Sequence, residues 1–177
     1  MRAPRRLDPE SVVEHLPRLY RAARAWTRSR EEAEDLVQET VARLLARPRF
    51  VREEGDLGYL LRALRNTMIS QRRAQARRPA TTPFSQELAG GSRPLDDPAQ
   101  AAEVREVHGA IDELPADFRD ALVAVDVAGL SYVEAARALG IAEGTLTSRL
   151  FRARDRVARR LGGEDLQPAP QPRLPDQ

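Results

Sequence analysis

The 177-residue sequence contains no cysteine and no lysine, only two histidines, and aromatic residues at only 5% of its positions. Without cysteine there can be no disulfide, no thiolate nucleophile and no cysteine-ligated zinc. The histidines, His15 and His108, are far apart in the chain, so no metal or other cofactor is predicted. No apolar run approaches the ~18 residues of a membrane-spanning helix, and the basic N-terminus lacks the apolar core of a secretory signal. These absences predict a cytoplasmic protein without membrane insertion.

Charge is distributed unevenly along the chain. All 29 basic residues are arginines, whose planar guanidinium groups bind carboxylates and phosphates in a bidentate manner. Residues 31–39 hold five acidic residues and no base, whereas residues 57–86 and 144–163 each hold six arginines, with a single acidic residue in the latter range. This pattern predicts two contacts with anionic partners and one with a cationic partner. The alternative is that each segment is an ordinary solvated helix face.

The sequence predicts an all-α protein made of two small helical domains, because no alternating strand pattern appears. The domains are predicted over residues 8–76 and 98–161. Residues 77–97 between them are rich in proline and glycine and poor in apolar residues, which is typical of a flexible linker. Residues 162–177 are proline-rich and are predicted to be disordered.

Three helices are predicted in the N-terminal domain, over residues 9–27, 31–47 and 56–76. Asp8, which precedes a proline, and Ser29 are predicted as the N-caps of the first two helices. Helical spacing of apolar residues predicts the buried positions of these two helices: Val12, Val13, Leu16, Leu19, Ala23, Trp26, Ala33, Leu36, Val37, Val41, Leu44 and Leu45.

The acidic segment places three polar residues on one face of the second helix. Asp35, Gln38 and Glu39 are spaced i, i+3 and i+4, which brings them onto a shared face. Such a patch suits a rigid partner helix that carries arginines. Stabilisation of the helix dipole explains acidic residues of the first turn, such as Glu31 and Glu32. It explains Asp35 and Glu39, which lie deeper in the helix, less well.

The C-terminal domain contains the pattern of a helix-turn-helix. Ser131 and Glu134 form a capping-box sequence, and Gly140 provides a tight turn before a second helix. The start of that helix is polar, and such a helix enters the DNA major groove with its first residues on base edges, while later arginines meet phosphates. The alternative is a three-helix bundle with a charged face. The apolar stripe of the second helix is Leu146, Leu150, Ala153, Val157 and Leu161, and its opposite face holds Arg149, Arg152, Arg156 and Arg159 or Arg160.

Three segments resemble the sigma-70 family, and specifically its extracytoplasmic-function group, group 4. They are EEAEDLVQETVARLL, LLRALRNTMISQRR and DELPADFRDALVAVDVAGLSYVEAARALGIAEGTLTSRLFRARDRV. They resemble the polymerase-binding, promoter −10 and promoter −35 segments of that family, respectively. The resemblance implies that residues 8–76 are sigma region 2 and that residues 98–161 are sigma region 4.

The resemblance also implies roles for individual residues. Contacts with the clamp helices of the large subunit of core RNA polymerase fall on Asp35, Gln38 and Glu39. Recognition of the −35 element falls on Thr145, Thr147, Ser148, Arg149 and Arg152. Recognition of the −10 element falls on Arg62, Arg65, Asn66, Arg72 and Arg73. An alternative role for Asn66 is helix packing.

The expected function is that of an RNA polymerase sigma factor, which binds core polymerase and directs initiation at −10 and −35 promoter elements. The expected partners are core polymerase, promoter DNA and an anti-sigma factor. A stand-alone helix-turn-helix regulator is the alternative, but it leaves Asp35, Gln38 and Glu39 without a role. An enzyme is not expected, because His15 and His108 lie in separate domains and no glycine-rich phosphate loop is present.

Overall fold

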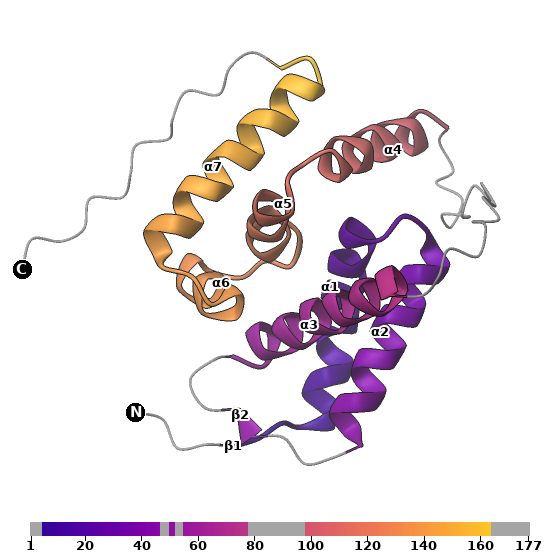
Figure 1. The fold of residues 1–177 in the computed structure, drawn as a ribbon, viewed down its shortest axis with the longest axis vertical. Helices are drawn as coiled ribbons and strands as arrows, with labels where there is room; N and C mark the ends of the chain where they lie inside the picture. Colours follow the sequence, from indigo (N-terminus) through magenta and orange to yellow (C-terminus); the bar gives the residue numbers. More distant parts are fainter. Residues whose placement is uncertain (1–4, 47–49, 52–54, 78–97, 164–177) are drawn as a thin grey trace, which may run out of the picture.

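The computed structural model describes residues 5–46, 50–51, 55–77 and 98–163. The prediction of an all-α fold is confirmed (Figure 1). The N-terminal half contains α1 (Pro9–Trp26), α2 (Arg30–Leu45) and α3 (Asp56–Arg77). The C-terminal half contains α4 (Pro98–Asp112), α5 (Ala116–Leu122), the π-helical turn η1 (Val123–Val127), α6 (Tyr132–Leu139) and α7 (Glu143–Arg160). The predicted linker and tail lie almost entirely outside the described residues.

One feature of the N-terminal half is absent from the sequence prediction. The two-residue strands β1 (Arg5–Arg6) and β2 (Phe50–Val51) pair in an antiparallel manner. The three predicted helices of this half begin and end within two residues of their expected bounds. Both predicted N-caps are confirmed. The Asp8 carboxylate accepts a hydrogen bond from the Glu10 amide at 3.0 Å, and the Ser29 hydroxyl accepts one from the Glu32 amide at 3.1 Å.

Helices α1, α2 and α3 pack around a mostly aliphatic core. Trp26 is buried, as predicted, together with leucines of all three helices. Two predicted core positions are wrong, because Val13 is 65% exposed and Leu45 is 52% exposed. Successive residues of an α-helix are separated by about 100° around its axis. Val12 and Leu44 take the inward positions, so their apolar neighbours in the sequence point to solvent.

The C-terminal half forms the predicted helix-turn-helix. The Ser131 hydroxyl accepts from the Glu134 amide, and the Glu134 carboxylate accepts from the Ser131 amide at 3.0 Å, which completes the capping box of α6. Gly140 has a φ of +69° and ends α6 in the left-handed region, where glycine carries no Cβ penalty. Leu146 and Leu150 are buried against α5 and α6. Leu161, predicted to be buried, is instead exposed at the end of α7.

The two halves pack against each other. Helix α3 contacts α6, the first helix of the helix-turn-helix, and α1 contacts both η1 and α4 (Figure 1). The buried apolar residues of the two halves belong to one continuous cluster. An ion pair between Arg65 of α3 and Asp120 of α5, with 2.6 Å between Nε and Oδ2, crosses the boundary. Within the described residues, the two halves therefore pack together around one continuous apolar core.

Candidate nucleic-acid and polymerase interfaces

The first three turns of α7 present an exposed polar face. Thr145, Ser148 and Arg152 are exposed, and their spacing of three and four residues places them on the same side of the helix. Thr147 lies on a different side of α7 and is half-buried, with its hydroxyl donating to the Glu143 carbonyl at 2.9 Å. Of the five predicted −35 residues, the structure therefore brings Thr145, Ser148 and Arg152 together in solvent and turns Thr147 away from them.

Arg149, the fifth predicted −35 residue, already has an acidic partner. Its Nη2 lies 2.7 Å from Oδ2 of Asp117 on α5, and its side chain is 29% exposed. About two turns further along α7, the guanidinium of Arg156 lies 5.1 Å from the centre of the Phe118 ring, a distance at which cation–π attraction operates. Helix α5 thus contacts two arginines on the basic side of α7.

Two further arginines of α7, Arg154 and Arg160, join the helix to other parts of the C-terminal half. Arg154 makes two hydrogen bonds to the Asp126 carboxylate of η1, at 2.9 and 2.6 Å. These bonds raise the pKa of Arg154 above its ordinary value. Arg160 lies 3.1 Å from the carboxylate of Glu113, in the turn between α4 and α5. These pairs fix the orientation of α7, because each joins it to a different element.

The predicted −10 residues of α3 separate into two groups. Arg62, Asn66 and Arg73 are spaced four and seven residues apart, so they share one side of the helix. Asn66 and Arg73 are exposed, and the partly exposed Arg62 lies over the ring of Tyr59 at 5.9 Å. Because the Asn66 side chain is exposed, the alternative in which it packs between helices is not supported.

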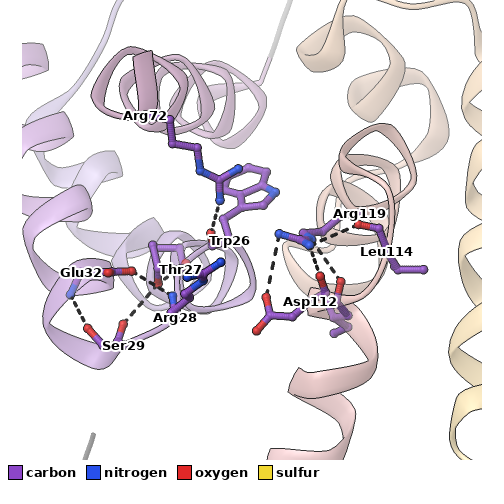
Figure 2. Close-up of polar contacts among 11 residues, drawn as sticks. Trp26, Thr27, Arg28, Ser29, Glu32, Arg72, Asp112, Leu114 and Arg119 are labelled. Carbon is purple, nitrogen blue, oxygen red and sulfur yellow. Dashed lines mark hydrogen bonds and ion pairs between the residues drawn. The ribbon is translucent and has the colours of Figure 1, made fainter. Parts of the chain in front are cut away.

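Arg65 and Arg72 form the second group, on the neighbouring side of α3, and both contact protein. Arg65 pairs with Asp120, and Arg72 donates to the backbone carbonyl of Trp26 at 2.6 Å (Figure 2). Trp26 is the last residue of α1, so Arg72 joins α3 to the end of that helix. Arg72 therefore stabilises packing within the N-terminal half, and Arg65 stabilises the contact of that half with the C-terminal half.

The acidic face of α2 is present as predicted, but its residues differ in exposure and in the contacts that they make. Asp35 and Gln38 are exposed. Glu39 accepts a hydrogen bond from Gln71 of α3 and forms an ion pair with Arg43. Asp35 and Gln38 are therefore the exposed residues of this acidic face, whereas Glu39 also links α2 to α3 through its hydrogen bond with Gln71.

A cavity of about 720 Å³ lies between the end of α1, the acidic face of α2, the end of α3 and the turn before α5. Its walls carry both signs of charge, with Asp35 and Asp112 facing the same space as Arg72 and Arg119. The Arg119 guanidinium donates to the backbone carbonyls of Ile111, Asp112 and Leu114 (Figure 2). The side chain of Arg119 therefore stabilises the C-terminal end of α4 and the turn that follows it.

Sequence reasoning did not single out the acidic residues of α5. Asp117 and Asp120 are three residues apart in the sequence, a spacing that indicates a shared helix face. Nothing local in the sequence identifies their partners, Arg149 and Arg65, which lie on other helices. Asp120 is only 6% exposed. Burial raises the pKa of its carboxyl group, and the neighbouring Arg65 opposes that rise.

Comparison with known proteins decides the family. The model of sigma-70 region 2 matches residues 12–78, and that of sigma-70 region 4 matches residues 105–157. The chain belongs to the sigma-70 family. It is 34% identical over 165 residues to the ECF RNA polymerase sigma factor EcfG of Rhodopseudomonas palustris, covering 90% of this chain and 89% of that protein. It is 35% identical over 150 residues to SigM of Mycobacterium tuberculosis, covering 84% and 74%.

A solved sigma factor has a similar fold. The sigma factor RpoE of Bartonella quintana, crystallised with the anti-sigma factor NepR, superimposes with a TM-score of 0.66 at 29% identity, covering 86% of this chain and 95% of that one. This chain is accordingly an RNA polymerase sigma factor of the extracytoplasmic-function group, which directs transcription initiation. In the described ranges, no group of His, Asp or Glu residues could hold a metal ion. No helix in those ranges is long and apolar enough to cross a membrane.

Proposed function

We propose that this sigma factor docks on the clamp helices of core RNA polymerase through α2 and recognises the −35 and −10 promoter elements through α7 and α3. The observation that carries this assignment is the helix-turn-helix whose second helix presents Thr145, Ser148 and Arg152 together in solvent. A stand-alone regulator is not favoured, because it gives the exposed residues Asp35 and Gln38 no partner.

The polymerase contact rests on Asp35 and Gln38, with Glu39 contributing from the edge of the patch. A carboxylate and an amide on a rigid helix face complement the guanidinium groups of a facing helix, and charge complementarity of this kind sets orientation and association rate. The double variant Asp35→Arg with Gln38→Arg should abolish co-purification with core polymerase and leave the far-UV circular dichroism unchanged. The matched control is Glu14→Arg, a charge reversal at an exposed position of α1, which should bind normally. Normal binding by the double variant would contradict the assignment.

Recognition of the −35 element rests on the first three turns of α7. Hydroxyl groups such as that of Ser148 bond to either kind of base edge, and arginine binds guanine O6 and N7 in a bidentate manner. Arg152→Ala should therefore cost about 1–3 kcal/mol and relax specificity at one base pair. Arg159→Ala, two turns further along, should weaken all sequences alike and reduce the salt slope by about 1. An equal loss on every −35 sequence for Arg152→Ala would exclude it as a base reader.

Recognition of the −10 element is assigned to the exposed side of α3, formed by Arg62, Asn66 and Arg73. Arginines on that side suit the phosphates of a melted strand, and strand separation is completed by capture of an unstacked base. Arg72 is exposed and donates a single hydrogen bond to the Trp26 carbonyl, so its other N–H groups can join this surface, whereas Arg65 joins it only if it leaves Asp120. Arg73→Ala should reduce open-complex formation without reducing core polymerase binding, as measured by permanganate reactivity of the melted strand.

An anti-sigma factor is proposed as a further partner, because the similar RpoE was crystallised with one. Bond formation during transcription is assigned to the polymerase, so this chain is proposed to have no enzymatic activity of its own. Its place of action is proposed to be the cytoplasm, where core polymerase and promoter DNA are found.

A further inference from the structure

We propose that Asp117 of α5 is a positioning residue for promoter recognition, which holds the guanidinium group of Arg149 in the orientation that reads one base pair of the −35 element. The inference rests on the function proposed for α7 and adds to it a residue outside that helix. Helices α5 and α7 pack against each other (Figure 1). Asp117 lies in the first turn of α5, and its Oδ2 is 2.7 Å from Nη2 of Arg149.

Arg149 lies beside exposed residues of the proposed −35 surface. It follows Thr145 by four residues and precedes Arg152 by three, a spacing that places the three residues along one side of α7. Thr145 and Arg152 are exposed, whereas Arg149 is half-buried and contacts α5. Arg149 is therefore at the edge of this surface, where it can contact protein and a base at the same time.

The ion pair leaves Arg149 able to bind a base. A guanidinium group carries five N–H donors in one plane, and the contact with Asp117 is made through Nη2. Donors on the other nitrogen atoms remain for bidentate contact with guanine O6 and N7. Because the group is rigid and planar, fixing the direction of one N–H group restricts the directions of the others. Asp117 therefore orients the base-reading edge of Arg149.

This orientation increases specificity in two ways. A free arginine side chain loses conformational freedom when it is fixed on a base, and that loss weakens binding. Contact with Asp117 restricts Arg149 before DNA binds, which strengthens its contact with the correct base pair. The exposed Asp117 carboxylate also repels phosphates, which weakens binding to sequences on which Arg149 finds no base. Specificity is the difference between these two affinities.

A purely structural role for Asp117 makes a different prediction. An acidic residue in the first turn of a helix is stabilised by the helix dipole, and the N-cap of α5, Pro115, provides no side-chain capping hydrogen bond. That role does not involve Arg149, so removing the charge of Asp117 would have the same effect whether or not Arg149 is present. The ion pair itself adds little to stability, because both of its side chains are accessible to solvent. Dependence on Arg149 therefore distinguishes the two roles.

The chain offers a matched control on the same helix. Nη2 of Arg159 lies 2.8 Å from Oδ2 of Asp155, and Arg159 is assigned to phosphates. Asp155→Asn therefore makes the same change of charge beside the same kind of partner, but at an arginine that reads no base. Asp117→Asn removes the carboxylate charge with almost no change in side-chain volume. Asp117→Glu keeps the charge on a side chain that is long enough to reach Arg149.

Promoter selectivity of the holoenzyme, formed from core RNA polymerase and the full chain, tests the proposal. A promoter found by run-off transcription is changed one base pair at a time across its −35 element, and initiation is measured on each duplex. Arg149→Ala should lose discrimination at one base pair. Asp117→Asn should lose roughly two- to tenfold of the discrimination at that same base pair, and Asp117→Glu should retain it. Asp155→Asn should change initiation on all of these promoters alike.

The double variant Asp117→Asn with Arg149→Ala shows whether Asp117 acts through Arg149. It should discriminate as well as Arg149→Ala alone. A further loss of discrimination in the double variant would assign Asp117 to the stability of α5 and overturn the proposal. Parent-like or sharper discrimination by Asp117→Asn would also overturn it, as would full discrimination by Arg149→Ala or an equal loss in Asp155→Asn.

The parent holoenzyme separates failure of this proposal from failure of the proposed function. If it initiates and discriminates among −35 sequences while Asp117→Asn behaves as the parent does, only the positioning role of Asp117 is refuted. A parent holoenzyme that does not initiate, or that tolerates every change in the −35 element, would instead refute the function proposed for α7.

Discussion

The turn of the helix-turn-helix depends on the backbone conformation of Gly140, which can be tested by adding a single methyl group. Gly140 has a φ of +69°, and a Cβ placed there would meet no atom within 4 Å. Gly109, inside α4, would also place a Cβ in open space, but it has no positive φ. The substitutions Gly140→Ala and Gly109→Ala therefore add the same atoms and differ in backbone conformation.

The expected changes in the free energy of unfolding have opposite signs. An alanine forced into the left-handed region costs about 1–2 kcal/mol, so Gly140→Ala should destabilise the protein by that amount. In a helix interior alanine is favoured over glycine by about 0.5–1 kcal/mol, so Gly109→Ala should stabilise it. The two variants should therefore differ by about 1.5–3 kcal/mol.

Urea denaturation of the full chain, followed by far-UV circular dichroism, measures this difference. The midpoint should fall for Gly140→Ala and rise for Gly109→Ala, with unchanged slopes in both, because the slope reports the surface exposed on unfolding. Midpoints that shift together in the same direction would refute the conclusion that backbone conformation at Gly140 sets the turn between α6 and α7.

Three further predictions concern the C-terminal half. Ser131→Ala should lower the free energy of unfolding by about 1 kcal/mol and Ser131→Thr should largely preserve it, since only threonine retains a capping hydroxyl. Hydrogen bonds from Ser131 lower the pKa of Glu134, so its contribution is present above the ordinary glutamate pKa and is lost as pH falls through the lowered value. Glu134→Gln should therefore flatten the acid limb of a stability-versus-pH curve, and an unchanged limb would contradict this. Leu146→Ala should cost about 2–5 kcal/mol because Leu146 is fully buried, whereas the exposed Leu161→Ala should change thermal stability little.

Local signals in the sequence predicted much of the fold. Asp8, Ser29 and Ser131 were each identifiable as N-caps because the capping interaction involves residues only two or three positions away. Helical spacing alone did not predict which of two adjacent apolar residues faces the core. The exposed Val13 and Leu45 were therefore misplaced. The β1–β2 ladder, with two residues in each strand, is too short to leave an alternating pattern.

The candidate site was predictable to the level of helix faces. The i, i+3, i+4 spacing correctly grouped Asp35, Gln38 and Glu39 on α2. The sequence could not reveal that Glu39 is engaged by Gln71, nor that Arg65 and Arg149 are engaged by α5. Each of these contacts joins helices whose approach is set by packing of the whole chain. Periodicity within one helix carries no information about them.

Run-off transcription tests the central claim, that this chain directs initiation by core RNA polymerase. Purified core polymerase, the purified chain and a pool of genomic fragments are combined, and the 5′ ends of the transcripts are sequenced. The account predicts discrete start sites that appear only when the chain is present and that share sequence elements near −10 and −35. The contradicting result is the absence of chain-dependent transcripts from a core enzyme that initiates normally with another sigma factor.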